Sequence, residues 1–564
     1  MPSSTPTPSR LPLASSPADP WPDPALSPPR KVLCVYPRHT NGYPAFAHSF
    51  RFFPKTKSLS PPLGLLLVAG TLPAHWSVRF VDEDIRPALD ADFLWSDLVL
   101  TSGTHAQRLL LADVADRAHR HGKVIALGGP AVSASPEDYP MFDLLHVGEM
   151  GDATRALVAA LAESIDRPAA QRVFRTTDRL ALDDFPLPAY HLVDPHHYLM
   201  LNLQWSSGCP FTCEFCDIPA LYGKAPRIKS NARVLEELDS ILAQGPLGAV
   251  FFVDDNLIGN KKAFRQLLPD LIAWQKEHGH PLQLVGECAL NVAQEPDILA
   301  MMREANFVEV YVGLETPEVD ALVAMSKRQN LRKPPIDSVR AIQDGGIAVS
   351  VGLIVGLDTD TATTADSIVE FVEAAEIPHV VVNMLYALPH SPLWDRLEAE
   401  GRLIPREFVT DSNIVFSEPR ERVMARWRSL VERLYEPGVV IGRYRRSFAR
   451  VLPQRLPLPP RRPTLAQVFL GLYALAATAY FVLLRSRYRR AFAPFGLDLL
   501  RGGHVDSLIS AVSVSYHMIA YRDGVLAKGA QPCIHTAATP SAQSSTGPST
   551  GGTSADDITF AHVG

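Results

Sequence analysis

The sequence has few cysteines and no excess of positive charge. Six cysteines in 564 residues are too few for a disulfide scaffold, and three of them fall within eight residues, a spacing typical of metal binding in a reducing compartment. The 54 Lys and Arg residues against 60 Asp and Glu residues give a net charge of −6, which offers no general attraction for nucleic acid. We therefore expect a cytoplasmic protein with no nucleic-acid partner.

The two ends of the chain lack the patterns of folded domains and of an export signal. Residues 1–30 contain ten prolines but no continuous apolar segment, so they do not form a secretory signal. Residues 531–564 are rich in Ser, Thr and Gly. We expect a disordered leader and a disordered tail around a globular centre, because 46% of all residues are hydrophobic.

Residues 31–171 alternate short apolar runs with helical patterns. The expected strands are 31–36, 76–81, 97–101, 123–127 and 144–147. This alternation predicts an α/β domain with a doubly wound, Rossmann-like parallel sheet, which binds ligands in the loops at the carboxyl ends of its strands. The polar and small residues in those loops are Ser102, Gly103, Thr104, Gly128, Gly129, Gly148 and Glu149. Residues 172–197 are predicted to form a connector to the next domain.

Residues 198–407 repeat a strand-then-helix pattern six times. The expected strands are 199–204, 248–253, 282–287, 307–312, 347–355 and 379–386. Six such units predict a partial (β/α)6 barrel of the TIM type, with its active site at the carboxyl rim of the strands. The residues that follow those strands include Cys209–Cys216, Asp254, Asp255, Glu287, Gly313, Glu315, Gly356 and His390.

The cysteine cluster carries the strongest chemical signal. Cys209, Cys213 and Cys216 follow the first barrel strand with the spacing C-x3-C-x2-C. Three thiolates can hold one side of a [4Fe-4S] cube and leave one iron open to a substrate or cofactor. A structural zinc site is the alternative, but it usually needs four ligands, and no histidine follows until His278.

This cysteine motif, with Phe215 beside its last member, resembles that of the radical S-adenosylmethionine enzymes. The resemblance implies that the open iron binds the amino and carboxylate groups of S-adenosylmethionine. An electron from an external donor such as flavodoxin or ferredoxin then splits this molecule to a 5′-deoxyadenosyl radical. The S-adenosylmethionine-binding residues that it implies are Phe215, Asp254, Asp255, Glu287, Gly313, Glu315, Gly352 and Gly356.

The two aspartates, the two glutamates and the last two glycines of this set also have a purely structural interpretation. The two aspartates are equally suited to cap the following helix. The two glutamates are equally suited to be hydrogen-bonded carboxylates of the core. Gly352 and Gly356 are equally suited to permit tight packing in a strand.

The N-terminal domain resembles the cobalamin-binding domain that precedes the barrel in the class B branch of this superfamily. The likeness rests on Pro61–Leu65, Val81–Asp82 and the glycine loops after the third, fourth and fifth strands. It implies that the loop residues from Ser102 to Glu149 named above bind cobalamin. The DxHxxG motif that supplies a histidine ligand in methionine-synthase-like domains does not occur in the chain, so the lower ligand of cobalt is not given by the sequence. A doubly wound domain without a cofactor is the alternative.

Within that branch the chain is similar to the hopanoid C-2 methylases and their relatives, over about residues 31–403. The likeness rests on the runs 216–219, 222–227, 253–262 and 385–389. It implies a cobalamin-dependent methyltransferase that methylates an unactivated carbon of a hopanoid or related lipid. Two alternatives stay open: a class B enzyme that methylates or cyclises a pigment or natural-product precursor, and a non-catalytic iron–sulfur and cobalamin protein for sensing or electron transfer.

Residues 408–530 are predicted to form a helical C-terminal region with one basic and one apolar segment. Residues 420–462 contain twelve Arg against three Glu. Residues 465–484 carry no charge and are followed by arginines at 485, 487, 489 and 490. Twenty uncharged residues reach the length of a membrane span, but they equally suit a buried helix or a helix at an anionic membrane surface. A hopanoid substrate would make peripheral contact at the inner face of the membrane useful to the enzyme.

Overall fold

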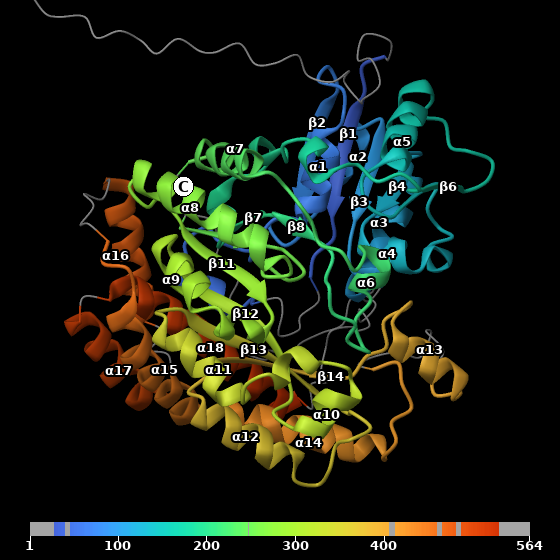
Figure 1. Cartoon of the computed structure of the whole chain (residues 1–564). Coiled ribbons are helices and arrows are strands. Elements are labelled where there is room, and N and C mark those ends of the chain that lie inside the picture. Colours follow the sequence, from blue (N-terminus) through green and yellow to red (C-terminus); the bar gives the residue numbers. More distant parts are fainter. Residues whose placement is uncertain are drawn as a thin grey trace, which may run out of the picture.

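The computed structural model describes residues 28–39, 46–245, 248–404, 412–458, 465–480, 487–502 and 504–528. The predicted disordered tail, Cys533 and nearly all of the predicted leader lie outside these residues. The described chain forms two parallel sheets followed by a set of C-terminal helices (Figure 1). The domain boundaries drawn from the sequence stay predictions.

The first sheet has six parallel strands in the order β2-β1-β3-β4-β5-β6. They are β1 (Lys31–Tyr36), β2 (Ser77–Asp82), β3 (Leu98–Ser102), β4 (Val124–Gly128), β5 (Leu144–Val147) and β6 (Arg172–Arg175). The first five confirm the predicted strands. The sixth comes from the start of the predicted connector, and its sequence, RVFR, is too polar to read as an apolar run because it lies exposed at the edge of the sheet.

Helices cover both faces of this sheet, and a separate apolar core lies against each face. The helices are α1 (Leu63–Gly70), α2 (Asp90–Trp95), α3 (Arg108–Arg120), α4 (Pro130–Ala134) and α5 (Asp152–Glu163). In β1, Leu33 and Val35 belong to one core while Val32 and Cys34 belong to the other. Burial on both faces explains why the strands read as continuous apolar runs rather than as alternating ones.

The second sheet is the partial barrel, with six parallel strands in the order β14-β13-β12-β11-β10-β7. They are β7 (Leu201–Leu203), β10 (Ala249–Phe252), β11 (Gln283–Cys288), β12 (Phe307–Glu315), β13 (Ala348–Val355) and β14 (His379–Met384). The helices along it are α7 (Asn231–Leu242), α8 (Lys261–Glu277), α9 (Pro296–Glu304), α10 (Val319–Ala324), α11 (Pro335–Asp344), α12 (Thr364–Ala374) and α13 (Pro392–Ala399). All six predicted strands are confirmed.

A short antiparallel pair, β8 (Ser206–Ser207) and β9 (Arg227–Ile228), flanks the cysteine loop and the one-turn helix α6 (Ile218–Leu221). In Figure 1 this segment lies between the two sheets.

The C-terminal helices pack against the barrel and against one another. They are α14 (Arg420–Leu434), α15 (Pro437–Val451), α16 (Leu465–Ala479), α17 (Arg489–Arg501) and α18 (Val505–Lys528). The Trp427 indole N–H donates to the carbonyl of Val382 at 3.0 Å, and the Tyr435 hydroxyl donates to that of Val380 at 2.8 Å, so α14 is hydrogen-bonded to β14.

The basic segment binds acidic residues of the barrel. Its ion pairs are Arg426 with Asp360, Arg433 with Asp366, Arg443 and Arg446 with Glu373, and Arg450 with Asp344. These arginines are therefore part of the contact between the C-terminal helices and the barrel.

Candidate functional site

The cysteine loop lies between β8 and α6 and is held by backbone hydrogen bonds on three sides. The N–H of Cys209 donates to the carbonyl of Gly223 at 3.1 Å. The N–H of Glu214 donates to the carbonyl of Met325 at 2.9 Å, and the N–H of Leu393 donates to the carbonyl of Glu214 at 2.8 Å. The loop is thus fixed to its own hairpin, to the segment after α10 and to the start of α13.

The three thiols of this loop are free and lie partly or wholly buried. Burial, with repulsion from the neighbouring thiols, raises the pKa of Cys216 to about 12 and also raises that of Cys209. The Gln329 side-chain amide donates to Cys213 Sγ at 3.4 Å, and the Asn256 amide lies 4.0 Å from Cys209 Sγ. Thiols in such surroundings ionise when a metal cation binds them, and amide donors stabilise the sulfur ligands of clusters.

This donor set fits the predicted [4Fe-4S] cluster. All three sulfurs come from one loop whose backbone is already fixed, and each thiolate of a cube binds its own iron. Within the described part of the chain, no three His, Cys, Asp or Glu side chains are close enough together to hold a single metal ion.

Asp254 and Asp255 hold the backbone that leads into the cysteine loop. The Asp254 carboxylate accepts hydrogen bonds from the backbone N–H groups of Trp205, at 3.3 Å, and Ser206. The Asp255 carboxylate accepts from the N–H of Gly208 at 2.7 Å. Burial raises the pKa of Asp254 to about 7 and that of Asp255 to about 6. These two carboxylates therefore position the loop, and a contact with S-adenosylmethionine stays a prediction.

The helix-cap interpretation of the two aspartates is wrong. Helix α8 begins at Lys261 and is capped by Asn260, whose side-chain oxygen accepts a hydrogen bond from the N–H of Ala263 at 3.1 Å. A cap must lie directly before the first turn, and the two aspartates are too far upstream.

Glu315, at the end of β12, forms a buried ion pair with Lys327. The Lys327 ammonium also lies 5.4 Å from the centre of the Phe215 ring, beside the last cysteine. A Cβ at Gly313 would lie 2.5 Å from the Glu315 carboxylate and 2.8 Å from Lys327 Nζ, so only glycine leaves room for this pair. The structure supports the core-carboxylate interpretation of Glu315. Sequence analysis missed Lys327, which is twelve residues from its partner and belongs to no recognisable motif.

Glu287 lies next to the last residue of β11, and its backbone carbonyl accepts a hydrogen bond from the N–H of Leu257 at 2.8 Å. Its carboxylate has no hydrogen-bond partner among the described residues. Burial and the nearby aspartates raise its pKa to about 7. An unpaired carboxylate at the rim of the barrel is suited to bind a polar or cationic ligand, which is the role that the resemblance implies for it.

Close packing explains why glycine occurs at position 352 within β13 and at position 356 directly after it. A Cβ at Gly352 would lie 2.5 Å from the Tyr311 hydroxyl. Gly356 has a φ of +90°, and a Cβ there would lie 2.5 Å from the Phe416 ring. Their predicted contact with S-adenosylmethionine stays a prediction.

The predicted cobalamin loops come together at the carboxyl edge of the first sheet. A Cβ at Gly129, which has a φ of +97°, would lie 2.3 Å from Ser102 Oγ, so the loops after β3 and β4 touch. The Gln107 side chain accepts from the N–H of Thr104 at 2.9 Å and donates to the carbonyl of Pro37 at 2.6 Å, which joins the loops after β3 and β1. The other predicted residues at this edge are Gly103, Gly128 and Gly148.

One buried polar atom at this edge fits a bound group. The Thr101 hydroxyl, at the end of β3, is buried and has no hydrogen-bond partner among the described residues. Buried hydroxyls are rarely left unpaired in folded proteins, so a ligand over this edge would supply the missing partner. The residues present thus fit a large polar cofactor such as cobalamin.

Glu149 reaches from the first sheet to the barrel. Its carboxylate accepts a hydrogen bond from the Ser207 hydroxyl at 2.6 Å and forms ion pairs with Arg227 and, at 3.3 Å, with Arg179. Ser207 lies two residues before the first cysteine. The carboxylate is therefore engaged by the barrel and the connector, and its predicted contact with cobalamin stays a prediction.

A second contact joins the same two edges. His390, in the loop after β14, is hydrogen-bonded through Nε2 to the carbonyl of Ala134 in α4 at 2.9 Å. The carboxyl edge of the first sheet and the carboxyl rim of the barrel therefore face each other across the cysteine loop (Figure 1).

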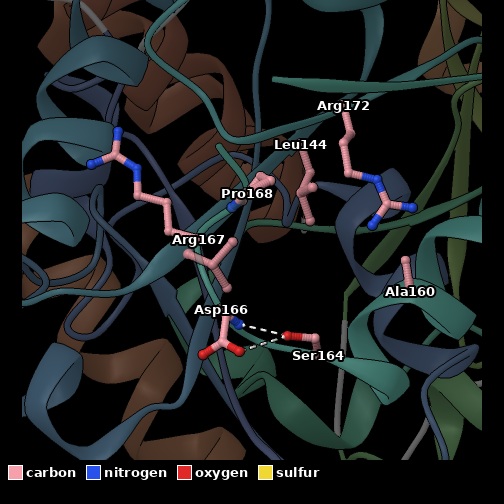
Figure 2. A pocket seen from close by; sticks show the side chains of 8 residues that line it. Leu144, Ala160, Ser164, Asp166, Arg167, Pro168 and Arg172 are labelled. Carbon is pink, nitrogen blue, oxygen red and sulfur yellow. Dashed lines mark hydrogen bonds between the residues drawn. The ribbon is translucent and has the colours of Figure 1, made fainter. Parts of the chain in front are cut away.

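A cavity of about 230 Å³ lies at the opposite edge of the first sheet. Figure 2 shows its lining residues, among them Leu144 and Arg172 at the amino ends of β5 and β6, with Ser164 hydrogen-bonded to Asp166. Ligands of doubly wound sheets bind at the carboxyl ends of the strands, so this cavity is not part of the candidate site.

Two family models match the chain. One, described as the radical SAM superfamily, matches residues 203–372, and one described as a domain of unknown function (DUF4070) matches residues 391–531.

Two curated proteins are similar to the chain in sequence, and a solved structure is similar to it in fold. The chain is 45% identical over 493 residues to the hopanoid C-2 methylase of Rhodopseudomonas palustris, which covers 87% of this chain and 93% of that protein. It is 32% identical to an uncharacterised methyltransferase of Synechocystis, over 85% of this chain and 91% of that protein. The solved structure of the radical S-adenosylmethionine methyltransferase TsrM from Kitasatospora setae is similar to this chain with a TM-score of 0.55 at 14% identity. The similarity covers 86% of this chain and 99% of that chain, and it shows that the two share a fold.

The identity to the hopanoid C-2 methylase extends over nearly the whole of both chains, and the cysteine loop lies within the matched radical SAM segment. The protein belongs to the radical S-adenosylmethionine superfamily and, within it, to the family of the hopanoid C-2 methylase.

Proposed function

We propose that this protein is a cobalamin-dependent radical S-adenosylmethionine methyltransferase that adds a methyl group to C-2 of a hopanoid. The observation that carries this proposal is the 45% identity over 93% of the hopanoid C-2 methylase. The fixed three-cysteine loop supplies the chemical feature that such an enzyme requires.

The reaction needs radical chemistry because a saturated carbon has no lone pair with which to attack a sulfonium methyl group. When bound, the cluster with S-adenosylmethionine would supply a hydrogen-abstracting radical, and cobalamin would supply the methyl group. Cys209, Cys213 and Cys216 hold the cluster, and the loops after β3, β4 and β5 hold cobalamin. Asp254 and Asp255 fix the backbone on which the first cysteine stands.

The carboxyl edge of the first sheet and the carboxyl rim of the barrel face each other, so cofactors bound at these two edges would both border the substrate. The carbon that loses hydrogen must also receive the methyl group, so both cofactors must border the same space. The contacts of Glu149 with Ser207 and of His390 with Ala134 keep these edges together. An external flavodoxin or ferredoxin supplies the electron.

A helix of the C-terminal region is suited to meet the membrane that contains the lipid substrate. On α16, Phe469, Leu472 and Tyr473 are 72%, 57% and 48% exposed, and their spacing places them on one face of the helix. Arg487, which follows in the chain, is exposed and forms an ion pair with Asp523 at 2.6 Å. No helix in the described part of the chain is both long and apolar enough to cross a bilayer. The exposed apolar face of α16 is the surface that we propose to contact the inner face of the membrane.

Vesicle cosedimentation tests this membrane contact. A Phe469→Ser/Leu472→Ser variant is expected to lose most of its binding to vesicles containing phosphatidylglycerol. A matched Leu94→Ser variant, which removes a leucine 67% exposed on α2, is expected to bind like the wild type. Equal binding by all three proteins would contradict the membrane contact, and so would a stable dimer that covers α16.

Hopanoid analysis tests the reaction and its substrate. The gene is expressed, with cobalamin supplied, in a bacterium that makes only unmethylated hopanoids, and the extracted lipids are examined by mass spectrometry. A new hopanoid heavier by one CH₂, with the added mass in ring-A fragments, is the expected result. No new species from protein with an intact cluster would move the substrate to another lipid or to a pigment.

Formation of 5′-deoxyadenosine separates an enzyme from a sensor or electron-transfer protein. The reduced, cluster-loaded protein is expected to release 5′-deoxyadenosine from S-adenosylmethionine. No release from fully loaded protein would overturn the enzymatic function.

A further inference from the structure

His39 and Asp84 form a fixed pair beyond the carboxyl ends of β1 and β2. His39 Nδ1 lies 2.5 Å from one oxygen of the Asp84 carboxylate, and the backbone N–H of His39 donates to the other oxygen at 2.9 Å. The backbone N–H of Asp84 in turn donates to the Asp82 carboxylate at 2.9 Å. The Asp84 carboxylate therefore binds both the imidazole and the backbone of His39, through one oxygen each.

His39 follows β1, which borders the point where the strand order of the first sheet reverses, between β1 and β3, and Asp84 follows β2 on the other side of β1. From β1 the chain continues to β2 on one side of the sheet, and β3 lies on the other side of β1. Open parallel sheets bind their ligands in the crevice formed at this point, beyond the carboxyl ends of the strands. His39 lies three residues beyond β1, and Pro37 is hydrogen-bonded to Gln107 from the loop after β3.

The contacts of the ring leave one nitrogen for a ligand. Asp84 engages Nδ1, and the Tyr36 ring packs edge-on against the imidazole at 5.7 Å. No described residue is hydrogen-bonded to Nε2, and the side chain is 37% exposed. Histidines that bind metals commonly give their other ring N–H to a carboxylate, which fixes the tautomer and makes the ligating nitrogen more basic.

We propose that His39, oriented by Asp84, is the lower axial ligand of cobalt when cobalamin binds at the first sheet. This inference rests on the cobalamin dependence in the proposed function. The imidazole and its carboxylate come from the ends of different strands, 45 residues apart in sequence, so no local motif reveals them.

Electron paramagnetic resonance of the purified full-length protein tests this ligation. The protein is loaded with cobalamin and reduced to the cobalt(II) state, in which one axial nitrogen splits each cobalt line into three. Because the nucleotide base of cobalamin also supplies a nitrogen, the protein is labelled with nitrogen-15 histidine. Ligation by His39 is expected to change the threefold splitting into a twofold one, and His39→Ala is expected to abolish the twofold splitting.

A matched control is His196→Ala. His196 Nδ1 lies 2.8 Å from the Asp194 carboxylate, which reproduces the His39 pair at the surface of the connector. This variant is expected to keep the labelled splitting. Asp84→Asn is expected to retain cobalamin while the fraction of histidine-ligated cobalt falls.

Two further outcomes are distinguishable. Retained cobalamin whose spectrum does not respond to the histidine label would overturn the role of His39 and leave the proposed function intact. Wild-type protein that retains no cobalamin after gel filtration would overturn the cobalamin dependence together with this inference.

Discussion

Replacing Glu149 with alanine is expected to loosen the contact between the first sheet and the barrel. The Glu149 side chain is 8% exposed and engages Arg227, Arg179 and Ser207. Removing one partner of a buried charge pair costs about 3–5 kcal/mol, but the two arginines are 30% and 36% exposed, which reduces this cost through solvent screening. We expect a loss of about 2–3 kcal/mol of docking free energy, which increases the undocked population roughly 30- to 150-fold.

Limited proteolysis of the predicted connector, residues 172–197, measures this population. When the open segment closes faster than the protease cleaves it, the cleavage rate is proportional to the equilibrium population of the open state. A nonspecific protease should therefore cut the Glu149→Ala variant faster than the wild type by about the same factor by which the undocked population increases. Asp366→Ala is the control, because its pair with Arg433 is 60% and 39% exposed and is worth about 1 kcal/mol or less. Cleavage of the Glu149→Ala connector within twofold of the wild-type rate would refute the reasoning.

Three other predictions concern the barrel. Cys213→Ala is expected to abolish cluster binding. Cys288→Ala, which changes a buried cysteine outside the loop, is the control and should keep the wild-type iron content. Normal iron content in Cys213→Ala would contradict the ligand assignment. Lys229→Met leaves the fully buried Glu237 carboxylate with the longer contact to Arg233 Nε at 3.8 Å, and should cost about 3 kcal/mol in urea unfolding. The double variant Lys229→Met/Glu237→Leu should recover most of this loss, and equal stabilities of the single variant and the wild type would refute a stabilising buried pair. Because burial raises the folded-state pKa of Glu287 to about 7, its contribution to stability is present below pH ~4.3 and is lost as the pH rises to ~7. Glu287→Gln should flatten this part of the pH profile of unfolding, and an unchanged profile would argue against the raised pKa.

The strands could be predicted from sequence because each is an apolar run bounded by loop residues. Burial on both faces of a parallel sheet leaves no polar residue to interrupt runs such as Val32–Val35. The same reasoning fails for β6, since an edge strand with the sequence RVFR is held by its backbone pairing with β5 and not by its side chains.

The site was predictable where it is local and not where it depends on long-range contacts. The three cysteines lie within eight residues, so their spacing alone indicates a cluster. The ion pair of Lys327 with Glu315 joins the segment after α10 to the end of β12, and the contact of Glu149 with Arg227 joins the first sheet to the barrel. Nothing in the sequence around those residues indicates their partners, because only the fold brings them together.

The ion pairs of the basic segment make the barrel dependent on the helices that follow it in the chain. The twelve arginines of residues 420–462 resemble a polyelectrolyte tail, yet in the folded protein several of their counterions are carboxylates of the barrel, such as Asp344, Asp366 and Glu373. A fragment that ends before α14 would expose these carboxylates as an acidic patch and uncover the apolar face beneath Trp427. The C-terminal helices thus cover the edge strand β14 of the partial barrel, and we expect a barrel expressed without them to be less soluble and less stable.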